Sequence, residues 1–174
     1  MADVNAAIDY VLHREDAAMT GAIVELKDGA GKTRFGLTSR WHADLAAQGY
    51  FGSMPEGAAL AMAMATYRSN YARPLQLAQI VSQDLANHML SFAVNDGVHQ
   101  GVVLLQQAIN VLTPHAVQVD GIVGNATLLA LQCLMPVSIL NALRLQEIAF
   151  YRDLAEKNES DRGFLLGWVN RALA

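Results

Sequence analysis

Apolar residues recur every three to four positions along most of the chain, a spacing that predicts amphipathic helices. In the first such segment Val4, Ile8, Val11 and Leu12 fall on one face. Glycines and prolines interrupt the pattern at intervals, as they do between helices. The sequence therefore predicts a mainly α protein, with helices over residues 4–15, 41–48, 53–73, 77–92, 98–112, 126–134, 136–157 and 164–172.

The third of these helices carries a start signal. Ser53-Met-Pro-Glu56 has the form of a capping box, in which a serine and a glutamate three residues later bond to backbone N–H groups of the first turn. Proline is also favoured early in the first turn of a helix. We therefore expect a helix to begin at this motif.

Helical patterning stops between Gly21 and Gly36. Within this stretch residues 22–27 and 32–37 have strand-like patterns and flank a Gly-rich segment, 28–31, which favours a turn. We expect a small β-hairpin directly after the first helix. Alternation along its first strand places Glu25 on the face opposite Val24 and Leu26, exposed to solvent.

Composition narrows the classes of protein. Of the 174 residues 53% are hydrophobic and 16% charged, which excludes a disordered chain and allows a sizeable core. The net charge of -4, without a run of Lys or Arg, argues against a nucleic-acid partner. The longest apolar run, residues 58–65, is far shorter than the ~20 residues that span a bilayer. We therefore expect no stable membrane insertion.

Three further features concern targeting, the single cysteine and metal binding. Asp3 and Asp9 stand where a secretory signal would carry positive charge and then an apolar core, so we expect synthesis without a signal peptide. The single cysteine, Cys133, lies in an apolar segment and is expected to be buried. The five histidines show no paired-ligand spacing, so neither a metal nor another cofactor is expected.

Glu15 departs from the pattern of the first helix. At about 100° per residue it falls roughly 20° from Ile8, in the middle of the apolar face. Burial and the partly negative end of a helix both raise the pKa of a carboxyl group, as the proton donor of a glycosidase requires. The alternative is that the helix ends one turn earlier, or that Arg14 or another base forms an ordinary ion pair with Glu15.

A helix ending in glutamate, then a hairpin, then an all-helical remainder is similar to the lysozyme-like arrangement, in which the hairpin forms a wall of the cleft.

Several motifs make this likeness more specific. Asp28, Gly31, Thr33 and Gly36-Leu-Thr38 follow Glu15. Further motifs are Tyr67-Arg-Ser-Asn-Tyr71, Phe92-Ala-Val-Asn-Asp-Gly97, Leu104-Leu-Gln-Gln107, Val119-Asp-Gly-Ile-Val-Gly-Asn-Ala-Thr127 and Phe164-Leu-Leu-Gly-Trp-Val-Asn-Arg171. In these motifs and their order the chain resembles glycoside hydrolase family 108, phage and secretion-associated N-acetylmuramidases with a lysozyme-like fold, over nearly its whole length. It departs from the family directly after Glu15, where Asp-Ala-Ala replaces two glycines and a tyrosine.

The resemblance implies roles for individual residues. Glu15 would donate the proton, and Asp28 would be the second catalytic group, with Glu25 and Asp16 as the other acids that the sequence offers near the hairpin. Substrate-binding roles fall on Thr33, Tyr67, Tyr71 and Asn95. The residues themselves allow plainer alternatives, which are a turn role for the aspartate, a helix-end role for the asparagine and core packing for the two tyrosines.

The resemblance also implies a function and a division of the chain. The expected activity is hydrolysis of the β-1,4 bond between N-acetylmuramic acid and N-acetylglucosamine in peptidoglycan. Residues 1–94 would form the lysozyme-like catalytic part, and residues 95–174 a helical peptidoglycan-binding-like region packed into the same globule.

The expected partners are the glycan strands of peptidoglycan. The protein would be made in a bacterial or phage-infected cytoplasm and would act in the periplasm or cell wall, delivered by a holin or a secretion machinery. The changes after Glu15 leave open a non-catalytic peptidoglycan-binding or secretion-accessory protein on the same fold. The apolar composition alone also allows a helical interaction protein without a sugar site.

Overall fold

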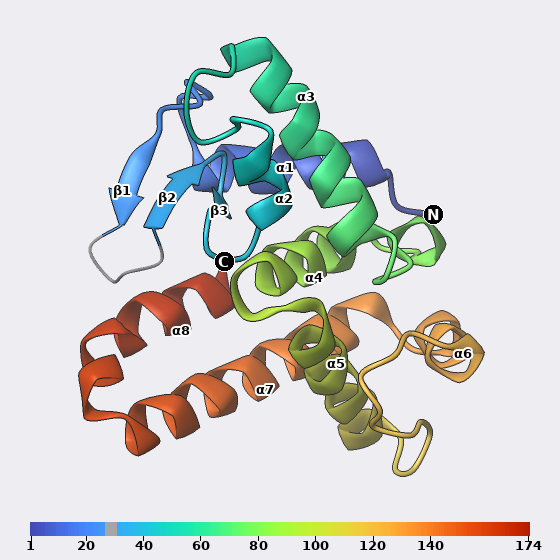
Figure 1. Ribbon diagram of the computed structural model, residues 1–174. Coiled ribbons are helices and arrows are strands. Elements are labelled where there is room, and N and C mark those ends of the chain that lie inside the picture. Colours follow the sequence, from blue (N-terminus) through green and yellow to red (C-terminus); the bar gives the residue numbers. More distant parts are fainter. Residues whose placement is uncertain (27–30) are drawn as a thin grey trace.

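The computed structural model describes residues 1–26 and 31–174 and confirms a mainly α fold with a small sheet after the first helix (Figure 1). The α-helices are α1 (Val4–Glu15), α2 (Ala43–Ala47), α3 (Glu56–Thr66), α4 (Gln83–Asp96), α5 (Val98–Leu112), α6 (Asn125–Cys133), α7 (Pro136–Lys157) and α8 (Leu165–Leu173). Shorter helical segments are the π-helix η1 (Tyr67–Ala72) and the 3-10 helices η2 (Leu77–Gln79) and η3 (Glu159–Phe164).

Helix α4 lies at the centre of the molecule and contacts α1, α5 and α7 (Figure 1). The sheet and α1 to α3 lie on one side of it, and α5 to α8 lie on the other. Most of α4 is buried, from Leu85 to Ala93. Its position between the two halves of the chain makes one continuous hydrophobic core.

The apolar face predicted for α1 packs against α4. Ile8, Val11 and Leu12 are fully buried, and burying each such side chain contributes roughly 1.5–3 kcal/mol. Asp3 caps the helix, because its carboxylate accepts hydrogen bonds from the backbone N–H groups of Asn5 and Ala6. The packing brings the C-terminal end of α1 beside the C-terminal end of α4, 80 residues later in the chain.

The sheet has three antiparallel strands in the order β1 (Val24–Leu26), β2 (Gly31–Arg34) and β3 (Leu37–Thr38). The first two form the predicted hairpin, and the sequence pattern did not indicate the third. Phe35 and Gly36 join β2 to β3, both with positive φ, which is the geometry of a type I′ turn. The turn went unrecognised because phenylalanine seldom adopts positive φ, whereas this ring is held in the core.

One predicted helix cap and one predicted helix start are wrong. Helix α3 begins at Glu56, inside the predicted motif, but its N-cap is Pro55 without a side-chain hydrogen bond, so the Ser53 capping box does not form. Helix α4 begins at Gln83, and Ser82 caps it by accepting a hydrogen bond from the Leu85 N–H. Residues 77–80 had suggested an earlier start, because the buried Leu77 and Ile80 of the η2 turn mimic helical spacing.

Cys133 is exposed, in contrast to the sequence expectation. Helix α6 buries Thr127, Leu128 and Leu131, and residue 133 lies away from this face at 100° per residue. The apolar composition of the segment concealed which side packs on the core.

Within the described residues, no single helix has both the length and the apolar character needed to cross a membrane. Helices α6 and α7 together would meet that criterion by length and composition, but they are bent by 119°.

Candidate active site

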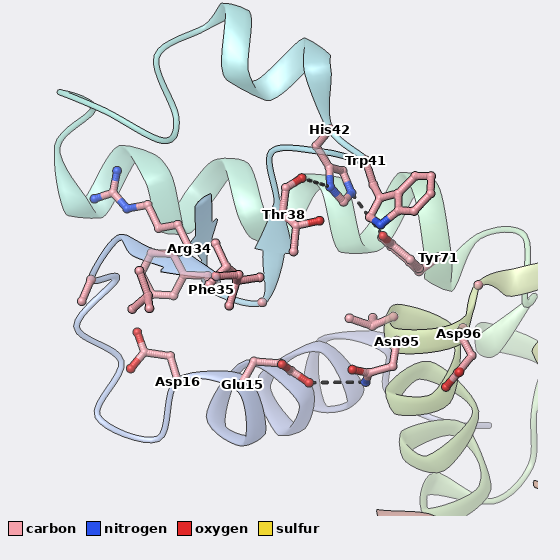
Figure 2. A pocket seen from close by; sticks show the side chains of 18 residues that line it. Glu15, Asp16, Arg34, Phe35, Thr38, Trp41, His42, Tyr71, Asn95 and Asp96 are labelled. Carbon is pink, nitrogen blue, oxygen red and sulfur yellow. Dashed lines mark hydrogen bonds between the residues drawn. The ribbon is translucent and has the colours of Figure 1, made fainter. Parts of the chain in front are cut away.

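A pocket of about 790 Å³ opens between the sheet and the C-terminal ends of α1 and α4 (Figure 2). The strands form one wall, as the order of elements predicted, and Val24 and Leu26 face it while Glu25 faces away. Three of the four predicted substrate-binding residues line the pocket together with Glu15, namely Thr33, Tyr71 and Asn95.

Glu15 is the last residue of α1 and lies at the pocket rather than inside the core. Glu15 lies on the apolar face of the helix, as predicted. The expected burial in the core is wrong, since Glu15 is only partly buried. The reason is that the pocket begins where the packing of α1 against α4 ends. The amide Nδ2 of Asn95 lies 3.5 Å from Glu15 Oε1 and 2.9 Å from the Ser91 carbonyl oxygen (Figure 2). Asn95 therefore faces the carboxylate from the opposite helix.

Tyr67 does not line the pocket; it packs in the core, which is the alternative that its helical spacing favoured over the substrate-binding role implied by the resemblance. It is fully buried behind the turn between β2 and β3, and its hydroxyl donates a hydrogen bond to the Phe35 carbonyl oxygen at 2.8 Å. Burial, and then the charge of Glu15, raise the pKa of Tyr67 well above its usual value, so the hydroxyl stays a donor. Tyr67 thus stabilises the turn at Phe35 and Gly36, which lies next to Glu15.

Gly36 lets this turn approach the acid. Its φ is +75°, and a Cβ added there would lie 2.5 Å from the Tyr67 hydroxyl and 2.7 Å from Glu15 Cγ. Both atoms lie far inside normal contact distance, so any side chain would displace them. The glycine is needed for its conformation and for its lack of a side chain.

Gly36→Ala is therefore expected to lower hydrolytic activity as well as stability, since it moves both Glu15 and Tyr67. Gly49→Ala is the matched control, because Gly49 has φ +78° but no atom within 4 Å of an added Cβ. The control is expected to lose only the backbone term of ~1–2 kcal/mol and to keep full activity. Thermal unfolding and initial rates measure both effects. Equal behaviour of the two variants would show that the contact with Glu15 does not matter.

The upper wall of the pocket in Figure 2 carries residues that sequence reasoning missed. His42 Nδ1 lies 3.0 Å from the Thr38 carbonyl oxygen and therefore donates to it. His42 Nε2 lies 3.1 Å from the Tyr71 hydroxyl, which it thereby orients. Burial raises the pKa of Tyr71, so this hydroxyl also keeps its proton.

Trp41 is the second missed residue. Its indole lines the pocket and is 74% exposed, with the Arg40 guanidinium 5.1 Å from the ring centroid. An aromatic ring left so open is available to pack on a ligand. The sequence offered one signal, the segment Arg40-Trp-His42 directly after the strands, which combines aromatic and polar groups where a helix core was expected.

Thr33 holds the centre of the sheet wall. It pairs with Val24 on one side and Thr38 on the other, and its hydroxyl donates to the Leu37 carbonyl oxygen at 3.2 Å. The lone pairs of the hydroxyl oxygen remain able to accept from a water or a ligand. The predicted second catalytic group, Asp28, lies outside the described residues.

Two other acids, Asp16 and Asp96, line the pocket, and each accepts a hydrogen bond from another part of the protein. Asp16 Oδ2 accepts from the Gly21 N–H at 2.7 Å and so closes the loop from α1 to β1. Asp96 Oδ2 accepts from the Tyr151 hydroxyl at 2.6 Å. Burial raises the pKa of Asp96, while the Tyr151 hydrogen bond and the charge of Arg171 oppose this effect. In the described ranges no group of three His, Cys, Asp or Glu side chains could hold a metal ion.

Comparisons with known proteins divide the chain in two. A family model described as "Glycosyl hydrolase 108" matches residues 8–97, and one described as "Predicted Peptidoglycan domain" matches residues 100–173. A solved structure titled "Structure of Brucella abortus SagA" is similar with a TM-score of 0.65 and 22% identity, covering 98% of this chain and 93% of that chain. At this identity the likeness shows the fold. A search of curated proteins gave no match.

Proposed function

The chain belongs to the glycosyl hydrolase 108 family, and from this premise we propose that it hydrolyses the β-1,4 bond between N-acetylmuramic acid and N-acetylglucosamine in bacterial peptidoglycan. The observation that carries the proposal is the position of Glu15, whose carboxyl group lies in a pocket of about 790 Å³ with polar and aromatic side chains opposite. The match of residues 100–173 to a peptidoglycan domain supports the same polymer as substrate.

In the proposed reaction Glu15 gives its proton to the glycosidic oxygen as the bond from that oxygen to the anomeric carbon breaks. The sugar ring becomes oxocarbenium-like, and water adds to the anomeric carbon. A second group must stabilise the positive charge or activate the water. The family resemblance gives this role to Asp28, and Thr33 would hold a water through its free lone pairs.

The remaining pocket residues would bind the sugars. Trp41 offers an open ring for stacking on a sugar face, while the Tyr71 hydroxyl, oriented by His42, offers a hydrogen bond. Asn95 offers an amide to an acetamido group and at the same time keeps Glu15 in place. In this arrangement residues 1–94 perform the chemistry, and residues 95–174 help to hold the wall polymer. A holin or a secretion machinery would deliver the protein to the wall.

A second candidate is a wall-binding or secretion-accessory protein without turnover. The observation that favours it is the segment Asp16-Ala-Ala18, which replaces the family glycines after the acid. The structure gives Asp16 a role of its own in closing the loop to Gly21, so the replacement leaves the end of α1 well formed.

Analysis of the ends produced from purified peptidoglycan tests the proposal. Digested glycan is reduced with borohydride, and mass spectrometry identifies the reduced sugar. Reduced N-acetylmuramic acid is the expected result. Reduced N-acetylglucosamine would overturn the choice of bond, and a non-reducing anhydro sugar would overturn hydrolysis. Binding without any new ends would favour the accessory protein.

A further inference from the structure

A second hollow, of about 1020 Å³, lies where the two halves of the chain meet. One wall comes from η1 and the segment that follows it, including Arg68 and Arg73. The facing wall is the loop before α6, with Gly121, Ile122 and Val123. This second pocket therefore joins the part of the chain that carries the acid to the part that matches a peptidoglycan domain.

The described residues that line the second pocket include two arginines, Arg68 and Arg73, while the nearby Asp120 carboxylate accepts a hydrogen bond from the Ile122 N–H. None of the described residues that line the pocket is acidic, although the whole chain has a net charge of -4. Arg68 and Arg73 are both exposed, and neither forms an ion pair within residues 1–26 and 31–174. The Arg68 guanidinium donates a hydrogen bond to the neutral Asn5 side chain. Two guanidinium groups without carboxylate partners suit a ligand that brings its own carboxylates.

The pocket also has an ordered floor and an apolar side. The Gln76 side chain donates to the Val123 carbonyl oxygen and ties the segment after η1 to the loop before α6. Gln76 itself has φ +50°, a conformation unusual for this residue type. Ile122 is 67% exposed and lines the same pocket, so small apolar groups of a ligand can pack against it.

The two pockets are lined by neighbouring residues of the same two segments. Tyr71 lines the first pocket, whereas the next two residues, Ala72 and Arg73, line the second. The same change occurs between α4 and α5, where Gly97 lines the first pocket and Val98 the second. The π-helix η1 includes Tyr71 and Ala72, and π-helical turns are frequent at functional sites. Residues adjacent in the chain therefore line the two pockets.

We propose that the second pocket binds the peptide stem of the wall polymer whose glycan strand occupies the first pocket. The stem is a short peptide with free carboxylates and small methyl side chains, which match Arg68, Arg73 and the apolar Ile122. This inference rests on the proposed function, because it takes peptidoglycan as the ligand of the first pocket. It gives the loop of residues 121–123 a direct part in recognition of the wall.

A titration of the whole protein with a sugar-free synthetic stem peptide tests this site. The peptide with free carboxylates is expected to bind the protein at least about tenfold more tightly than the same peptide with all carboxylates amidated. Arg73→Gln and the double variant Arg68→Gln/Arg73→Gln should lose this preference. Arg152→Gln is the control, because Arg152 is also exposed but lies on α7 beside Asp153 and Glu156. Equal affinity for both peptides, no binding, or unchanged binding by the double variant would overturn the inference.

Hydrolysis of peptide-free glycan strands separates this inference from the proposed function. The arginine variants are expected to cleave such strands at the wild-type rate, since neither arginine lines the first pocket. Cleavage without peptide binding would overturn only the second pocket. Peptide binding without cleavage of any glycan would overturn the proposed function and leave the peptide site standing.

Discussion

Glu15→Gln is expected to lower kcat on peptidoglycan by roughly 10²–10⁴-fold, the usual contribution of a general acid, while the melting temperature stays unchanged. Glutamine has the same shape, and its amide oxygen can still accept from the Asn95 amide. It cannot release a proton to the glycosidic oxygen. Because that transfer occurs only in the transition state, KM should change little. Release of soluble reducing ends measures the rate, and circular dichroism follows unfolding.

Asp16→Asn provides the matched control, because Asp16 is the adjacent acid and lines the same pocket. The asparagine oxygen can still accept from the Gly21 N–H, so the loop after α1 should keep its shape. This variant is expected to retain activity within a few-fold. Activity of Glu15→Gln above a tenth of wild type, or an equal loss in Asp16→Asn, would show that another group donates the proton.

His88→Ala is expected to reduce the free energy of unfolding by about 3–5 kcal/mol, because it leaves a buried carboxylate without its partner. His88 Nε2 of α4 lies 2.8 Å from Glu147 Oε2 of α7, and Glu147 is 1% exposed. Within the described residues Glu147 Oε1 has no hydrogen-bond partner. At roughly 2–4 °C per kcal/mol for a chain of this size, the melting temperature should fall by about 6–20 °C.

Two further variants give this prediction its controls. Replacing both residues by leucine should restore much of the stability, because two apolar side chains can fill the space of a buried hydrogen-bonded pair. His13→Ala should change stability by less than ~0.5 kcal/mol, because His13 pairs with Asp9 on the exposed face of α1. An equal loss in His88→Ala and in the double variant would show that packing, rather than the unpaired carboxylate, causes the effect.

The same pair gives stability a dependence on pH. Burial raises the pKa of Glu147, and the hydrogen bond and charge of His88 only partly oppose this effect. The folded protein therefore holds this proton more tightly than the unfolded chain. The contribution of Glu147 to stability is greatest below its unfolded pKa and falls as the pH rises through the raised pKa of the folded state. Relative to wild type, Glu147→Gln should consequently become more stable over that rise in pH.

The sequence predicts those parts of the fold that depend on local patterns. The apolar stripe of α1, the hairpin after it, and α5 and α7 all follow from helical or strand periodicity. Errors arose where tertiary packing overrode a local signal. Ser53 has the spacing of a cap but makes no cap bond, and Leu77 is buried by a 3-10 turn rather than by a helix. Phe35 takes a positive φ because the core holds its ring.

The site could be predicted only in part for a related reason. Periodicity showed that Glu15 faces inward, but not that a pocket begins there instead of more core. Asn95 was selected through family resemblance, and it meets Glu15 only because α1 packs against α4. Trp41 and His42 became apparent only once the strands placed the next segment over the acid. Residues brought together from distant parts of a chain leave no local pattern in one sequence.

The hydrogen bond between Asp96 and Tyr151 limits which parts of this chain could be exchanged for parts of another protein. Asp96 ends α4 at the edge of the first pocket, and Tyr151 lies on α7 in the C-terminal half. His88 and Glu147 cross the same boundary. In a chimera that exchanged the C-terminal half for a foreign wall-targeting module, His88 and Asp96 of α4 would both lose their hydrogen-bond partners. The two halves of the chain therefore cannot be exchanged independently. A new specificity is better sought by changing surface residues while both halves are kept.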